Sequence, residues 1–210
     1  MNGRAGLVLA QLSAVDRNLR HRFGAVNGFT LIDVVTAAAV LSILSAMAVP
    51  LIRDVLDGMK LGNGARQVER ELQTARLKAV SSNRPMRVRF NCPVAGQYRM
   101  VELVGTPSTP AAADSDGNRC KETLYPYPAA DREPVTLPNN DGPIRRLDAA
   151  LSFGSATKAL EFWPDGSVHQ DNGAAGGWPV LTGTGTSITL IKGSATKSIT
   201  VNGIGKIQIQ

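Results

Sequence analysis

The sequence predicts an α+β protein in which a long N-terminal helix packs on an antiparallel β-sheet head. Residues 34–52 are apolar with no formal charge, residues 61–79 carry apolar side chains at helical spacing, and short alternating segments follow from Met86. The expected parts are a leader over 1–28, a membrane-spanning helix over 29–56, an amphipathic helix over 57–84 and a β-rich head over 85–210.

The charge of the chain is concentrated before the apolar run. The net charge of the 210 residues is +6, and half of it comes from residues 1–28, which hold four arginines and one aspartate. This division argues against a nucleic-acid-binding role for the rest of the chain. Arginines on the N-terminal side of an apolar run predict a cytoplasmic N-terminus and an exported C-terminal part.

The apolar run Val34–Ile52 is long enough to span a membrane. Its 19 residues rise by about 28 Å as a helix, close to the roughly 30 Å of a hydrocarbon core. Its hydroxyl side chains can bond back to preceding carbonyls. A plain anchor helix explains the run, and a secretory signal cleaved at the small residues Ala46–Ala48 is a second interpretation. Neither explains Asp33, the carboxylate just before the run.

A third interpretation comes from "GFTLID", residues 28–33. This stretch resembles the prepilin cleavage site of type IV pilins and type II secretion pseudopilins. The resemblance implies that a prepilin peptidase cuts after Gly28 and N-methylates Phe29. It also implies other pilin subunits as partners, an inner-membrane location, a periplasmic head and assembly into a filament. Asp33 stands where the family usually has Glu, and Pro50 matches a proline common in the family.

Asp33 and Pro50 are the expected assembly residues. The resemblance implies that the Asp33 carboxylate neutralises the α-amine of a neighbouring subunit, because two unpaired charges in low dielectric are costly. The alternative is that Asp33 caps the helix start, where the helix dipole favours an acid. Pro50 removes a backbone donor and should kink or open the helix, either for use in a filament or as a tolerated transmembrane proline.

The second half of the helix is amphipathic. We expect Gly58, Gly62 and Gly64 to weaken its junction with the membrane segment, and "SSNRP", residues 81–85, to end it. The sequence from 65 to 90 resembles the minor pseudopilin H and FimT-like class. The apolar stripe consists of Leu61, Ala65, Val68, Leu72, Ala75 and Ala79.

The head should be built from short antiparallel strands. "MRVRF", residues 86–90, alternates and should pair with residues 97–104, whereas residues 105–146 indicate long loops or an insertion. Further on, Pro164-Asp165-Gly166 indicates a turn between two strands, and "NGIG", residues 202–205, a hairpin. The order of these last segments resembles the C-terminal half of the same pseudopilin class.

Two cysteines lie in the expected exported part. An even count in an oxidising compartment favours a disulfide between Cys92 and Cys120, which would stabilise the fold by roughly 3–4 kcal/mol on the chain-entropy model. Two free thiols are the alternative.

Catalytic chemistry is not expected. No Cys/His cluster has metal-ligand spacing, no catalytic motif stands out, and no cofactor is implied. His169 is expected to be a surface residue, and Trp163 and Trp178 are expected to pack in the core or loops. We therefore interpret the chain as a peptidase substrate and not an enzyme.

DNA uptake is the alternative function. Some FimT-like minor pilins bind DNA through arginines near the C-terminal tail, whereas the tail here offers only Lys206. A basic patch on exposed faces of the first strands would be the candidate surface. Its residues would be Arg84, Arg87, Arg89 and Arg99.

Overall fold

The computed structural model describes residues 28–105, 113–128, 138–173 and 177–210, with the side chains at positions 50 and 51 excepted. Most of the expected leader lies outside these residues. The chain forms two compact units, Met1–Leu51 and Ile52–Gln210. Each unit is described by itself.

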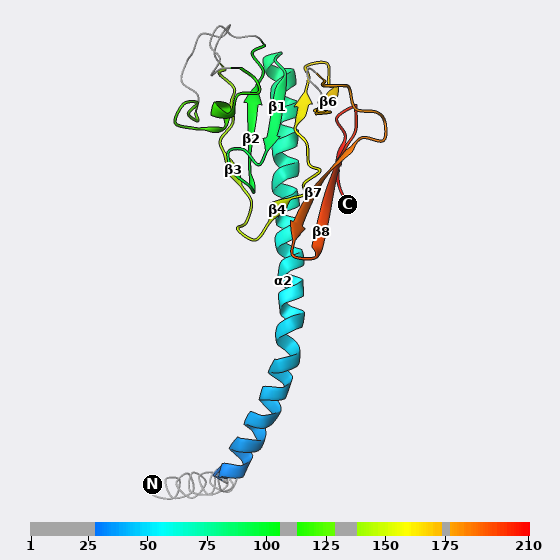
Figure 1. Ribbon diagram of the computed structural model, residues 1–210. Helices are drawn as coiled ribbons and strands as arrows, with labels where there is room; N and C mark the ends of the chain where they lie inside the picture. The colour runs from blue at the N-terminus through cyan, green and yellow to red at the C-terminus, as the bar shows by residue number, and fades with distance from the viewer. Residues whose placement is uncertain (1–27, 106–112, 129–137, 174–176) are drawn as a thin grey trace, which may run out of the picture. The chain divides into compact units, whose positions relative to one another are not determined.

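One helix, α2 (Leu31–Ser82), contains both predicted helical segments without interruption (Figure 1). Helical structure continues through Pro50 and through Gly58, Gly62 and Gly64. The helix ends within the predicted "SSNRP" stretch, where Asn83 takes a positive φ of 52°. The predicted end is therefore confirmed.

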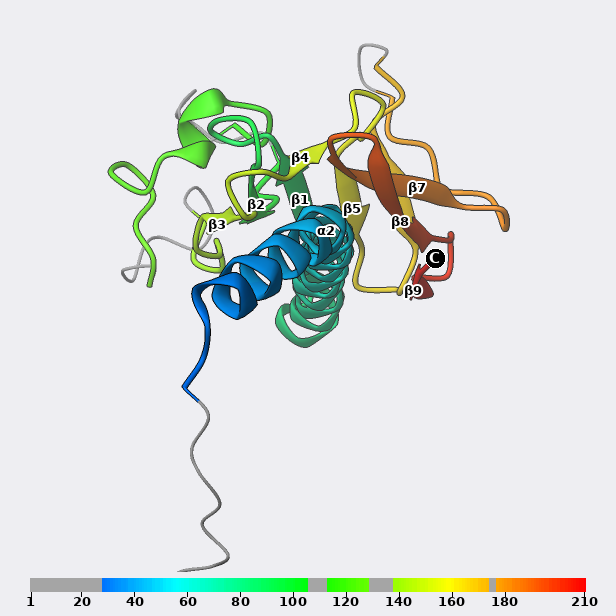
Figure 2. The same cartoon turned by 90° about the horizontal axis from the view of Figure 1, so that it is seen from below.

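The head contains two sheets, and every strand pair is antiparallel. Sheet A has the order β3-β2-β1-β5-β6, and sheet B has the order β4-β7-β8-β9. Figure 2 labels all of these strands except β6, which is labelled in Figure 1. The strands of sheet A are β1 (Met86–Phe90), β2 (Gln97–Glu102), β3 (Arg145–Arg146), β5 (Leu160–Phe162) and β6 (Val168–Gln170). Those of sheet B are β4 (Ser152–Phe153), β7 (Thr186–Lys192), β8 (Ala195–Val201) and β9 (Ile207–Ile209).

The predicted hairpins are present. β1 pairs with β2, β5 with β6 across the turn at residues 164–166, and β8 with β9 across "NGIG". The α+β fold predicted from the sequence is confirmed, because a long helix packs on antiparallel sheets through one hydrophobic core.

The core lies between the apolar stripe of α2 and the two sheets. All six predicted stripe residues are buried, each with 3% or less of its surface exposed. From sheet A they meet Met86 and Val88, alternate residues of β1, and from sheet B they meet Leu190 and Ile199. Burying such side chains stabilises the fold by roughly 1.5–3 kcal/mol for each large one.

The described part of the insertion at 105–146 is loop-rich but partly buried. Its described residues form only a short 3-10 helix, η2 (Gly117–Cys120), and β3, in agreement with a loop-rich segment. Arg119, Cys120, Tyr125 and Asp141 are nevertheless buried. These loops are therefore packed as part of the head.

Gly64 permits close packing between α2 and the loop before β4. A Cβ atom at this position would lie 2.8 Å from Leu151 Cδ1, whereas one at Gly62 would meet nothing within 4 Å. The two glycines lie on the same helix. Substituting each by alanine therefore separates the effect of close packing at Gly64 from the gain in helix propensity common to both positions.

We predict opposite effects for alanine at these two positions. Gly64→Ala should lower the free energy of unfolding by about 1 kcal/mol, since Leu151 must shift in a packed core. Gly62→Ala should raise it by up to about 1 kcal/mol, since alanine is the better helix former. Denaturant unfolding of a fragment beginning at Ile52 measures both changes, and equal gains in stability would contradict the packing role.

Candidate functional site

The residues of the predicted processing site lie at the start of α2. Gly28, Phe29 and Thr30 are outside the helix, and the Phe29 side chain is 89% exposed. Asp33 lies in the first helical turn. The scissile bond expected after Gly28 is therefore next to exposed, non-helical backbone.

Thr30 and Asp33 form a reciprocal cap. Thr30 donates to the Asp33 carboxylate Oδ2 through its backbone N–H at 3.0 Å and through its hydroxyl at 2.7 Å. The backbone N–H of Asp33 in turn donates to Thr30 Oγ1 at 3.3 Å. This is the arrangement of a capping box, so the structure contains the helix cap that the sequence offered as an alternative role for Asp33.

The apolar part of α2 meets the criteria for a membrane span. It is the one candidate span among the described residues, and the side chains from 31 to 49 are exposed within the chain. The hydroxyls of Thr36, Ser42 and Ser45 donate to carbonyls three or four residues earlier. The predicted back-bonding is confirmed, so these hydroxyls have partners even in an apolar environment. The side chain of Pro50 lies outside the described part of the chain.

The basic patch expected on the first strands is not an exposed patch. Arg87 is 6% exposed and Arg99 is fully buried, because the insertion and the loop carrying Trp178 cover the outer face of sheet A. The Arg87 guanidinium bonds to Glu161 Oε1, with Nε at 2.9 Å, and lies 4.0 Å over the Trp178 ring. The prediction of an exposed cationic surface at these positions is wrong.

The other two arginines of the expected patch also have partners. Arg84 Nε lies 3.3 Å from Glu102 Oε1. Arg89 is half-buried and donates to the carbonyl of Asp116 at 2.6 Å. Burial, together with the charges of Arg87 and Arg119, lowers the pKa of Arg89.

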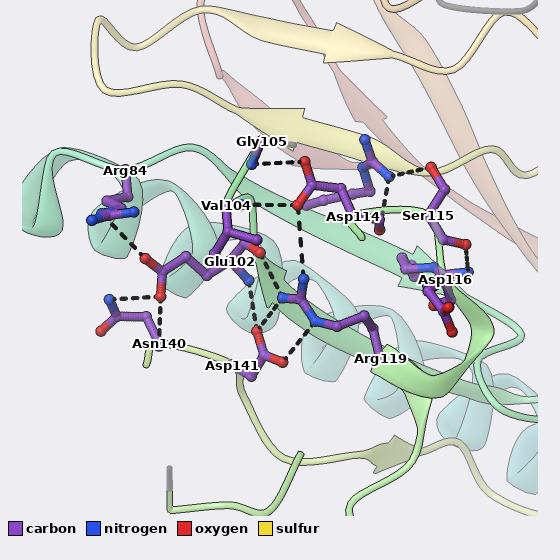
Figure 3. A network of polar contacts seen from close by, with 12 residues as sticks. Arg84, Glu102, Val104, Gly105, Asp114, Ser115, Asp116, Arg119, Asn140 and Asp141 are labelled. Carbon is purple, nitrogen blue, oxygen red and sulfur yellow. Dashed lines mark hydrogen bonds and ion pairs between the residues drawn. The ribbon is translucent and has the colours of Figure 1, made fainter. Parts of the chain in front are cut away.

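Arg119 is the centre of a buried charged network that the sequence did not indicate (Figure 3). Its Nη2 donates to Asp141 Oδ1 at 2.7 Å and to the Glu102 carbonyl at 2.6 Å, and its Nη1 lies 3.7 Å from Asp114 Oδ1. Asp141 Oδ1 also accepts the backbone N–H of Glu102 at 2.8 Å. Two segments of the insertion are thus joined to the end of β2.

Glu102 extends this network toward Arg84. Its Oε2 accepts the backbone N–H groups of Asn139 and Asn140, both at 2.8 Å. Arg84 approaches the other carboxylate oxygen of Glu102 (Figure 3). Because several donors converge on this buried acid, its negative charge is compensated inside the head.

Arg99 fixes the same insertion through backbone carbonyls. Its guanidinium donates to Gly142 O at 2.7 Å, Arg119 O at 2.8 Å and Tyr125 O at 2.5 Å. Cys92 and Cys120 are bonded as a disulfide, which ties η2 to the turn after β1. Polar and covalent links therefore hold the insertion to β1 and β2.

A second polar cluster surrounds His169. This residue is half-buried on β6, with its ring stacked on Trp163 at 5.0 Å between centroids and Nδ1 2.8 Å from the Trp178 carbonyl. His169 is therefore not the surface residue that the sequence predicted. Trp178 packs on Arg87 as expected for a loop residue, whereas Trp163 stays 38% exposed. The Ser167 hydroxyl and N–H donate to Asp165 and lower the pKa of its carboxyl.

Among the described residues, no group of three or more His, Cys, Asp or Glu side chains could hold a metal ion.

Burial raises the pKa of Tyr98, the buried tyrosine of β2. Its hydroxyl has no hydrogen-bond partner in the described structure.

Comparison with known proteins identifies the family. Residues 64–205 match the family described as type II transport protein GspH. The chain belongs to this family. A fimbrial protein of Dichelobacter nodosus is 30% identical over 104 residues, which cover 46% of this chain and 64% of that protein. The chain therefore matches less than two thirds of that curated relative's length.

Solved structures of a minor pseudopilin and of a minor pilin also resemble the structure of this chain. The minor pseudopilin EpsH of Vibrio cholerae aligns with a TM-score of 0.40 and 11% identity, over 72% of this chain and 96% of EpsH. The type IV minor pilin FimU of Pseudomonas aeruginosa aligns with a TM-score of 0.40 and 13% identity, over 72% and 89% of the two chains.

We predict that breaking the Arg119–Asp141 pair destabilises the head strongly. Arg119→Met leaves Asp141, 3% exposed, as a buried carboxylate without its cation, and such losses typically lower the free energy of unfolding by about 3–5 kcal/mol. Lys192→Met is the control, because it removes an ion pair whose acid, Asp57, is 45% exposed and should cost at most about 1 kcal/mol.

Denaturant unfolding of a fragment beginning at Ile52 gives both values. Equal losses for Arg119→Met and Lys192→Met would show that the buried network does not hold the head together.

Proposed function

We propose that this protein is a minor subunit of a type II secretion pseudopilus or a type IV pilus. It would be anchored in the bacterial inner membrane with an exported head. The observation that carries the proposal is the continuity of α2, which joins an apolar, exposed membrane-length segment to the head that matches the GspH family. The helix would lie first in the bilayer and then among the helices of neighbouring subunits.

The proposed maturation is cleavage by prepilin peptidase after Gly28 and N-methylation of Phe29. The exposed, non-helical backbone at these residues supports this proposal, because a peptidase needs access to an extended bond. Cleavage would create a cationic α-amine at Phe29, one helical turn from the Asp33 carboxylate.

Asp33 would then have two successive roles. Before assembly it caps α2 together with Thr30. During assembly we propose that it pairs with the α-amine of a neighbouring subunit, because a misplaced subunit would leave both charges unpaired in an apolar environment. The aspartate would therefore set the register of the subunit.

No observation favours DNA uptake as a second function. The arginines that would have formed its binding surface include Arg87 and Arg99, which are buried and bonded inside the head. The proposed work of the protein is filament assembly and, through it, protein secretion or pilus function, without catalysis.

N-terminal sequencing of the protein from membranes tests the maturation. We expect a mature chain that begins with N-methyl-Phe29. A chain that begins at Val49 would indicate conventional signal cleavage after Ala48, and an uncut Met1 would indicate a plain membrane anchor. Either result would contradict processing by prepilin peptidase.

The second test separates the pairing role of Asp33 from its capping role. We expect Asp33→Ala to reduce incorporation into filaments at least about tenfold, since it leaves the neighbour's amine unpaired, and Asp33→Glu to restore it. Thr30→Val removes the capping hydroxyl, typically worth about 0.5–2 kcal/mol, but keeps the carboxylate, so its incorporation should stay near wild type.

Immunoblots of sheared filament fractions measure incorporation, with total membrane protein as the loading control. If Asp33→Ala assembles as well as wild type, the pairing role is wrong. If Thr30→Val fails as severely as Asp33→Ala, capping alone explains the residue.

A further inference from the structure

Strand β9 leaves one side of its backbone unpaired. It is the last strand of sheet B and pairs with β8 on one side only. The backbone bonds Asn202 N–H to Lys206 O, 3.1 Å, and Gln210 N–H to Ser198 O, 2.8 Å, lie at the two ends of this pairing. In an antiparallel pair the bonded positions alternate, so the N–H and C=O groups of Ile207 and Ile209 point away from β8. No described strand lies on that side.

The turn before β9 is held rigidly. Arg76 of α2 donates to the carbonyls of Gly205 at 3.0 Å and Ile204 at 3.1 Å. At Gly203, a Cβ atom would lie 2.0 Å from the carbonyl oxygen of Leu181. The turn is thus fixed against the helix and a loop, yet the Ile204 side chain is 74% exposed. The turn therefore presents an exposed apolar side chain directly before β9.

A groove of about 590 Å³ lies beside this edge, between α2 and β9. Its helix side presents Leu77, 70% exposed, and Val80, 55% exposed. Its charged lining residues are the cations Arg76 and Lys206, and none of its lining residues is a carboxylate. The groove therefore offers apolar contact under a positive rim.

We propose that β9 and this groove bind an extended segment of another filament subunit. The segment adds to the sheet as a strand beside β9, and it carries apolar side chains toward Leu77 and Val80 and acidic side chains toward Arg76 and Lys206. This inference rests on the proposed filament function. It names the partner as protein, because the alternating donors and acceptors of Ile207 and Ile209 match the backbone of a strand, whereas a nucleic acid would use only the cations.

The short edge makes the groove important for the proposed contact. A strand of three residues gives few backbone bonds, so pairing there depends on the neighbouring groove for further contact. Partners without the matching apolar and acidic side chains would bind weakly. Backbone bonding thus supplies affinity, and the groove supplies selectivity.

The direct test compares Ile207→Pro with Ile207→Ala in the full chain. Both remove the isoleucine side chain, but only proline removes the N–H that points away from β8, and edge positions of this kind tolerate proline. A photo-crosslinker at the exposed Gln208 reports contact, with one at the exposed Ala149 as the control position. We expect Gln208 crosslinks to a pilin-type subunit that Ile207→Ala retains and Ile207→Pro reduces about tenfold.

Leu77→Glu provides an independent arm, since it alters an exposed side chain and leaves β9 intact. We expect it to reduce the Gln208 crosslink, with Asn63→Glu, an exposed substitution on the same helix, as the matched control. Equal crosslinking by Ile207→Pro and Ile207→Ala in folded protein, or adducts only with nucleic acid, would overturn the proposal.

The state of the N-terminus separates this proposal from the proposed function. Normal processing and filament incorporation of Ile207→Pro with an unchanged Gln208 crosslink would reject the β9 site and leave the filament function standing. Absence of processing and incorporation in the wild-type chain would instead reject the filament function, and this inference with it.

Discussion

The contact between one narrow face of α2 and the two sheets is the interaction on which the head depends. Three of the six stripe positions are alanines, at 65, 75 and 79, and each is fully buried. Small side chains let the sheets approach the helix closely, and Gly64 serves the same purpose beside Leu151. Both sheets meet this one helix, so residues of α2, sheet A and sheet B share a single hydrophobic core.

Buried charged side chains hold a different part of the head together. On the outer face of sheet A, Arg87, Arg99 and Arg119 join the sheet to the insertion and to the loop of Trp178. Breaking such groups from their partners is far more costly than breaking a surface pair. The insertion is therefore held by directional polar bonds and a disulfide, whereas the helix is held by apolar packing.

Periodic features of the sequence predicted most of the fold. The stripe of α2 and the alternation of β1 follow directly from the spacing of apolar residues, and the turn residues at 164–166 and 202–205 marked two hairpins. Arg87 and Arg99 were misassigned because alternation shows only that they share the outer face of the sheet. Their burial depends on residues 113–128 and on the loop of Trp178, which carry no period and reach the sheet through contacts such as Asp114 to Arg87. The position of Asp33 at the start of the helix suggested a cap, but the partnership with Thr30 became apparent only from the structure.

The short outer strands of the two sheets affect how readily copies of the head would aggregate when they lie close together. Among the described strands, the outermost ones of the two sheets, β3, β6, β4 and β9, contain two or three residues each. Long exposed edges invite strand pairing between copies and lead to aggregation, and natural sheets avoid this by keeping edges short. Heads that are crowded side by side would thus meet without offering one another a continuous template for fibril growth.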